Sequence, residues 1–168
     1  MRPPLQQSVT PPSTLFRCLI LALTLAAFKA SAQWPFPPPT TRDAQRNALN
    51  ALRSQINNFQ SSTRTAPNYG ENGFGAVWNQ FQGVRGAYTD LKQTLNPQQL
   101  ARGANALAEL DAGLDILQEA FGNFQNDVGA GRVPSAALRD MCQVLRQGST
   151  VWAQEMHKTC SQLRVGLS

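Results

Sequence analysis

Large apolar residues recur along this 168-residue chain at alternating spacings of three and four. The pattern is clear from Leu49 through Leu52 and Ile56 to Phe59, and three longer stretches repeat it farther along. This spacing places apolar side chains on one face of an α-helix, whereas a β-strand would show a period of two, which no stretch sustains. We therefore predict an all-α protein, with helices at about 41–63, 73–95, 97–128 and 135–164.

The residues between these stretches are typical of helix ends. Asn96, Pro97 and Gln99 match the N-cap, the first and the third position of a helix. A turn-rich run at 65–73 and the Gly-Ala-Gly sequence at 129–131 separate the other helices. Four amphipathic helices with short connections favour an antiparallel up-down four-helix bundle over residues 41–165.

Residues 1–32 have the three parts of a secretory signal peptide. Arg17 precedes an apolar run at 18–28, and small residues at 30–32 form a cleavage site before Gln33. The apolar run is about half the roughly 20 residues that a membrane-spanning helix needs. We therefore expect a secreted or periplasmic protein with no transmembrane segment in the mature chain.

Residues 33–40 form an expected proline-rich arm. The stretch 33–39 reads QWPFPPP, and consecutive prolines favour extended polyproline II structure because proline lacks the amide hydrogen that a helix interior needs. We expect this arm to act as a stiff spacer. Its aromatic residues Trp34 and Phe36 are also candidates for contact with a partner.

The net charge of +5 belongs largely to the leader. Arg2, Arg17 and Lys29 precede the cut and all acids follow it, so 12 basic residues face 10 acidic ones in the mature chain, a net charge of +2. Proteins that bind nucleic acid usually carry a strongly basic stripe or patch. We therefore expect no nucleic-acid partner.

Acidic and basic residues are unevenly divided between the predicted helices. Asp111, Asp115 and Glu119 follow one another at spacings of four in the third helix, while basic residues outnumber acids in the first and fourth. Residues four apart share a helix face. This acidic face could meet a basic partner or hold a divalent cation loosely; the alternative is a solvated face turned toward the basic fourth helix.

Cys142 and Cys160 remain after export, in an oxidising compartment where two cysteines usually form one disulfide. On one continuous helix they would lie about 27 Å apart, whereas a disulfide needs Cα atoms within about 7 Å. A break near Gly148 would allow the bond through a skewed turn. The apolar stripe continues through that glycine, so we expect one long helix whose thiols are buried or pair between chains in a homodimer.

His157 is the only histidine and follows Met156 directly. If Met156 faces the core, His157 is turned about 100° away toward water, so the two cannot act together as axial haem ligands. The haem-attachment signature CxxCH, the Glu-x-x-His pairs of di-metal bundles and the motifs of hydrolases do not occur in the sequence. We expect no enzyme, no metal and no cofactor; a haem- or metal-binding redox or sensor bundle that uses His157 is the alternative.

The stretch Leu95-Asn96-Pro97-Gln98-Gln99 resembles the LTxxQ motif of the Spy/CpxP family of periplasmic helical chaperones. It occurs once, has Asn where that motif has Thr, and coincides with the helix-capping signature described above. The resemblance implies a periplasmic chaperone as a second alternative function.

The signal peptide, the bundle and the lack of catalytic motifs favour an exported, non-catalytic protein. It would act as a binding or structural module in the periplasm or outside the cell, with a protein as its partner. The candidate interaction surface combines exposed aromatic residues with the acidic face of the third helix: Trp34, Phe36, Tyr69, Asp111, Asp115 and Glu119.

Overall fold

The computed structural model describes residues 41–166, except for the side chain of Glu71. In this range the chain forms α-helices and one 3-10 helix, with no strand. The elements are α2 (Thr41–Thr65), η1 (Ala66–Asn72), α3 (Gly73–Gln93), α4 (Pro97–Gly129) and α5 (Pro134–Gln162). The expected signal peptide and proline-rich arm, with Trp34 and Phe36, lie outside the described residues.

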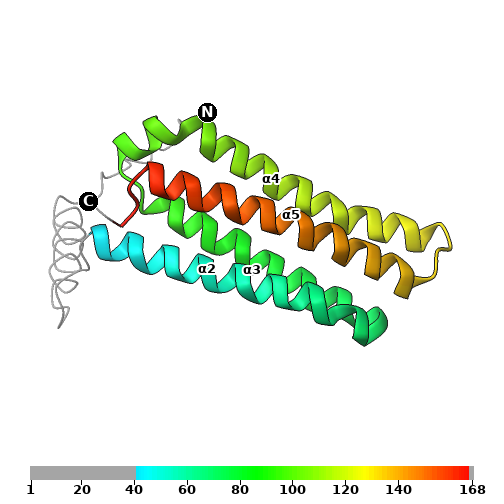
Figure 1. Cartoon of the computed structure of the whole chain (residues 1–168). Helices are drawn as coiled ribbons and strands as arrows, with labels where there is room; N and C mark the ends of the chain where they lie inside the picture. The colour runs from blue at the N-terminus through cyan, green and yellow to red at the C-terminus, as the bar shows by residue number, and fades with distance from the viewer. Residues whose placement is uncertain (1–40, 167–168) are drawn as a thin grey trace, which may run out of the picture. The chain divides into compact units, whose positions relative to one another are not determined.

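The four α-helices pack side by side as a helical bundle, as the apolar spacing predicts (Figure 1). The backbones of α2 and α3 approach closely, and so do those of α4 and α5. The helix α5 also contacts α2, and η1 packs against α2, α3 and α5. None of these helices is both long enough and apolar enough to cross a membrane.

Aromatic side chains fill the space between α3 and α4. Trp78 meets Phe121 edge to face at a centroid distance of 4.9 Å, and Phe74 stacks on Phe124 at 4.8 Å. Both geometries are favourable for aromatic pairs. The two helices therefore pack through large rings, whereas the closer α4–α5 contact needs small residues.

The first turn of α4 departs from the expected apolar stripe. Leu100 belongs to that stripe by spacing, yet its side chain is exposed. Gln99 and Gly103 occupy the inward positions instead, and Gly103 lies directly against the side chain of Leu163. The inward position at this turn is thus taken by Gln99, whose buried hydrogen-bond partners satisfy its side chain. Apolar spacing alone does not predict such a position.

A buried hydrogen-bond network formed by Gln45 and Gln99 joins four segments at this end of the bundle. The Gln45 side-chain amide donates to the Thr94 carbonyl at 2.9 Å and to Gln99 Oε1 at 2.8 Å. Gln99 in turn donates to the Leu163 carbonyl at 3.0 Å, and the Gly166 amide donates to Gln45 Oε1 at 2.9 Å. Because an unpaired buried amide is costly, this network fixes how α2, α4 and the chain after α5 meet.

The helix α5 runs without a break from Pro134 to Gln162 and passes through Gly148. The expectation of one continuous fourth helix is therefore confirmed. Cys142 and Cys160 are free, buried thiols on this rod, and its geometry keeps them too far apart for a disulfide within the chain.

Candidate functional site

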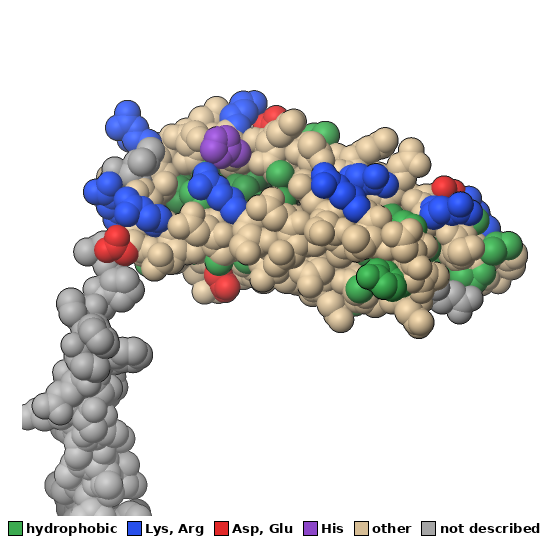
Figure 2. All heavy atoms as spheres, turned by 60° about the horizontal axis from the view of Figure 1, so that its bottom comes forward, with side chains coloured by type: hydrophobic (Ala, Val, Ile, Leu, Met, Phe, Trp, Pro, Cys, Tyr) green, Lys and Arg blue, Asp and Glu red, His purple; other side chains and the backbone are tan. Residues whose placement is uncertain are grey.

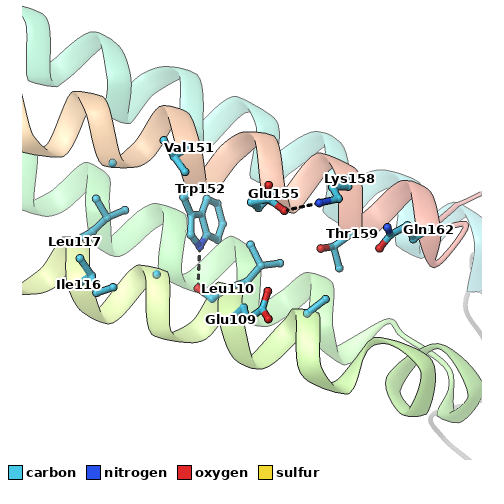
Figure 3. Close-up of a pocket in the computed structure, with 13 residues that line it drawn as sticks. Glu109, Leu110, Ile116, Leu117, Val151, Trp152, Glu155, Lys158, Thr159 and Gln162 are labelled. Carbon is cyan, nitrogen blue, oxygen red and sulfur yellow. Dashed lines mark hydrogen bonds and ion pairs between the residues drawn. The ribbon is translucent and has the colours of Figure 1, made fainter.

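A groove of about 460 Å³ lies between α4 and α5, and a second hollow of about 670 Å³ lies between α3 and α4. We call the first of these the α4–α5 groove (Figure 3). Residues from Ala106 to Leu117 on α4 and from Gly148 to Gln162 on α5 line it. At about 1.5 Å per residue, these segments give a groove about 17–21 Å long, the length of three to four helical turns.

Two glycines, one on each helix, allow the helices to come close enough to form this groove. A Cβ atom at Gly113 would lie 2.8 Å from Trp152 Cδ1, and one at Gly148 would lie 2.6 Å from Leu117 Cδ2. Real Cβ atoms do not approach other heavy atoms so closely, so the glycines permit the contact. The large side chains of Leu117 and Trp152 therefore pack into the partner helix and form the floor.

Trp152 is held in one orientation. Its Nε1–H donates a 2.8 Å hydrogen bond to the Leu110 carbonyl, which Figure 3 shows crossing from α5 to α4. Its ring also meets the ring of Tyr88 edge to face at 5.5 Å. A buried indole with its single donor satisfied is a rigid apolar surface. The groove thus has a preformed floor.

Two large aliphatic side chains stand exposed along the groove. Ile116 on α4 is 65% exposed and Val151 on α5 is 61% exposed, and both line the hollow. Scattered exposed aliphatics need no explanation, but two that flank a preformed apolar floor form one continuous apolar surface. This surface can bury an apolar partner.

Charged groups line the groove beyond Trp152, on the side away from Ile116 and Leu117. Glu155 forms an ion pair with Lys158 at 3.3 Å, and Glu109 lines the same part of the groove from α4 (Figure 3). The ion pair is solvent-exposed and contributes little stability. The groove therefore combines an apolar floor with a carboxylate at its margin.

His157 lies on a different side of α5, where it faces α2. It is exposed while Met156 is buried, as their helix positions predict. The His157 Nδ1 atom lies 3.5 Å from Arg53 Nη2, and no three His, Cys, Asp or Glu side chains of residues 41–166 gather as a metal site requires. The structure brings His157 together with arginines, which do not ligate metals.

The two thiols are chemically quiet. Burial raises the pKa of both Cys142 and Cys160 from 9.0 to about 11, and the nearby Arg146 and Arg53 offset this only in part. The Cys160 Sγ lies 3.6 Å from Met156 Sδ within the core. Because the thiolate is the reactive form, neither residue has the character of a nucleophile or a redox centre.

The acidic stripe of α4 does not face α5. Asp111 forms an ion pair with Lys92 at 2.6 Å, and Asp115 lies 3.9 Å from Arg85. Both of these cations belong to α3. The alternative reading, a solvated face turned toward the basic fourth helix, is therefore wrong for this pair. Glu119 lies on the same exposed side of α4, so the stripe is partly neutralised by α3 and is not an open acidic patch.

Tyr69 is 65% exposed and belongs to η1, while the α4–α5 groove is lined only by α4 and α5. Of the predicted surface, Trp34 and Phe36 lie outside the described residues. The structure thus does not join the predicted aromatics to the acidic stripe as one described site.

Sequence reasoning missed the α4–α5 groove, although two signals for it exist. Gly113 and Gly148 interrupt otherwise good helices at a cost of about 1 kcal/mol each relative to alanine. Ile116 and Val151 are aliphatic residues that fall outside the apolar stripes. Neither signal indicates which helices meet, so the groove becomes visible only when α4 and α5 are placed side by side.

No protein-family model, no curated protein and no solved structure matches this chain.

Proposed function

We propose that this protein is an exported, non-catalytic binding module, an up-down four-helix bundle whose binding site is the α4–α5 groove. The observation that carries the proposal is the exposure of Ile116 and Val151 beside a floor that Trp152 forms in a fixed orientation. Burying such side chains stabilises a complex by about 25 cal/mol per Å² of apolar surface.

The partner is an amphipathic helix of another protein that carries aliphatic side chains and a basic residue. The groove has the length of three to four helical turns, which fits a helix laid along it. Its margin carries Glu109, which supplies a carboxylate for a lysine or arginine of the partner.

The proposal is tested by titrating the protein with a synthetic amphipathic helix rich in leucine and lysine and following the Trp152 indole resonance by NMR. We expect that resonance and the amides of Gly113 and Gly148 to shift, while the amide of Gly86 on α3 does not. Ile116→Ser with Val151→Ser should weaken binding by about tenfold or more, since each lost aliphatic contact contributes about 1 kcal/mol.

Val144→Ser is the matched control, because Val144 is also an exposed valine of α5 but does not line the groove. Equal weakening by the control would mean that the peptide binds apolar surface indiscriminately. A second copy of this chain in the groove is the competing occupant, and a dimer that Val151→Ser dissociates in sedimentation experiments would replace the proposed partner.

Two further experiments test the alternative functions, a redox or sensor bundle and a chaperone. Stoichiometric haem or metal in protein purified from its native compartment, lost in His157→Ala, would contradict the non-catalytic binding module. Suppression of aggregation of unrelated unfolded proteins, lost on substitution of Ile116 and Val151, would assign the same groove to a chaperone.

A further inference from the structure

The opposite side of α5 carries a row of basic side chains that it shares with α2. We call this the basic row. Its members are Arg42, Arg46, Arg53 and Arg64 of α2 with Arg139, Arg146 and His157 of α5, all of them exposed. Figure 2 shows Lys and Arg side chains spaced along one face of the bundle with the histidine among them.

The helical period aligns these residues. At about 100° per residue, the four arginines of α2 fall within about 40° of one another around the helix axis. On α5, Arg139, Arg146 and His157 fall within about 20°. From Arg42 to Arg64 the row extends about 33 Å along α2 at about 1.5 Å per residue. Each helix therefore presents these side chains along a straight line.

The two lines meet across a cleft between α2 and α5. Arg53 Nη2 lies 3.5 Å from His157 Nδ1, and both residues line a hollow of about 230 Å³ together with Arg46. The hydroxyl of Ser161 and the amide of Asn50 border the same hollow. The cleft thus gathers two guanidinium groups from α2 with the imidazole of His157 and other polar groups from both helices.

Most charges of the row have no acidic partner. At the start of α2, Arg42 and Arg46 flank Asp43, and Arg42 Nε donates to the Gly166 carbonyl at 3.2 Å. Farther along the row, Arg53, Arg64, Arg139 and Arg146 take part in none of the ion pairs of residues 41–166, which use Arg85, Lys92, Arg132 and Lys158. The acids of α5 are occupied elsewhere, since Asp140 pairs with Arg132 and Glu155 with Lys158. Aligned like charges destabilise a fold. The row is therefore best satisfied by an external anion.

The shape and chemistry of the row select among anions. A line of about 33 Å calls for an extended ligand with repeated charges, and the arginine fork suits sulfate, carboxylate and phosphate alike. The exposed large apolar residues of the described chain are Tyr69, Leu100, Ile116, Val133, Val144 and Val151. None of them belongs to α2, and Val144 and Val151 are turned about 120–140° from Arg139 around α5.

The row consequently lacks the exposed aromatics on which single-stranded nucleic acids stack and the apolar side chains that insert into a lipid surface. A linear acidic polysaccharide requires neither. We propose that the basic row binds such a polysaccharide, with its sulfate or carboxylate groups held by the arginines and the cleft at Arg46, Arg53 and His157 as the central contact. This site is separate from the α4–α5 groove and does not depend on the function proposed for it.

The test is a titration of the full chain with a heparin fragment of defined length, followed by calorimetry at about 50 mM and about 200 mM NaCl, because contacts of this kind weaken steeply with salt. Arg46→Gln, Arg53→Gln and Arg146→Gln combined should weaken binding by tenfold or more. The matched control combines Arg85→Gln, Arg102→Gln and Lys158→Gln, which changes the net charge equally but leaves the row intact, and should weaken binding by less than threefold.

Equal weakening by the two triple variants, or no binding of the fragment at the lower salt concentration, would overturn the proposal. Duplex DNA or anionic vesicles that bind more tightly than the heparin fragment, with the same dependence on the row, would assign the row to nucleic acid or membrane instead. Because substitution removes like-charge repulsion, the row variant should fold at least as stably as the parent, and circular dichroism checks this.

Discussion

The two sides of α5 offer opposite chemistry to a partner. Toward α4, the helix presents Gly148, Val151 and Trp152 along an apolar groove. Toward α2, it presents Arg139, Arg146 and His157 in a line. The first side offers apolar surface to a partner, while the second supplies arginine charges, most of which have no acidic partner among the described residues. An amphipathic helix in a bundle thus has two partly exposed sides, one on each side of its buried apolar stripe. Each of these sides can carry a separate function.

The cysteines show how sharply the core is separated from the basic row. Cys142 and Cys160 have pKa values raised from 9.0 to about 11 by burial, even though Arg146 and Arg53 lie near them. Below pH 9 the raised pKa values leave about 100-fold less thiolate than in the unfolded chain. Alkylation of the native protein at pH 8 should therefore be at least 100-fold slower than alkylation in denaturant, as measured by mass spectrometry.

The raised thiol pKa values also make the stability of the fold depend on pH. The thiols of the unfolded chain ionise first as pH rises above 9, so the unfolding free energy should fall between about pH 9 and pH 11. Cys142→Ser with Cys160→Ser should reduce this fall. Rapid labelling of either thiol at pH 8 without denaturant would mean that the thiols are ionised or accessible in the native protein. It would contradict the separation of the core from the arginines of the row.

A side chain at Gly113 should disrupt the packing of α4 against α5 in the groove. In Gly113→Ala the new Cβ meets Trp152, whose hydrogen bond to Leu110 limits its movement, so we expect a loss of about 2 kcal/mol in unfolding free energy. Gly122→Ala on the same helix meets nothing within 4 Å and should gain up to about 1 kcal/mol. Urea unfolding of both variants measures the difference, and equal effects would contradict the close approach of α4 and α5.

Trp152→Phe should have a smaller effect on the same side. The substitution keeps an aromatic ring on the floor but leaves the Leu110 carbonyl without the indole donor, a loss of about 1 kcal/mol. The change should also weaken binding of an amphipathic helix. Thermal unfolding and the peptide titration test both effects, and unchanged values in both would remove Trp152 from the floor.

Removing charge from the basic row should give the smallest effect, with the opposite sign. Arg46→Gln, Arg53→Gln and Arg146→Gln together should raise the unfolding free energy by about 0.5 kcal/mol at low salt, because exposed like charges repel weakly. The gain should vanish near 1 M NaCl, where the screening length is about 3 Å. Destabilisation at low salt would indicate that the arginines have partners within the protein.

The helices follow from the sequence because the apolar period and the caps are local features. Asn96 and Gln99 form the capping box that their spacing predicts, with Asn96 Oδ1 accepting from the Gln99 amide at 2.8 Å. The second role of Gln99, its bond to Gln45, is not local and has no signature in spacing. The residues that resemble a chaperone motif therefore hold the end of the bundle together.

The candidate sites could not be predicted because they depend on how distant helices are rotated against one another. Basic residues outnumber acids in the first and fourth helices, but their common face appears only when α2 and α5 lie together, with Arg53 beside His157. The pairing of Asp111 with Lys92 depends on α3 in the same way. Spacing gives the face of each helix, whereas the neighbour of that face comes from the tertiary packing.

We expect the two sides of α5 to bind different ligands independently. One NMR titration tests it: the protein, with assigned arginine, histidine and indole resonances, receives the heparin fragment. We expect shifts at Arg46, Arg53 and His157, with no change at the Trp152 indole or at Gly113 and Gly148. Shifts centred on Trp152, or spread evenly over all arginines of the chain, would contradict it.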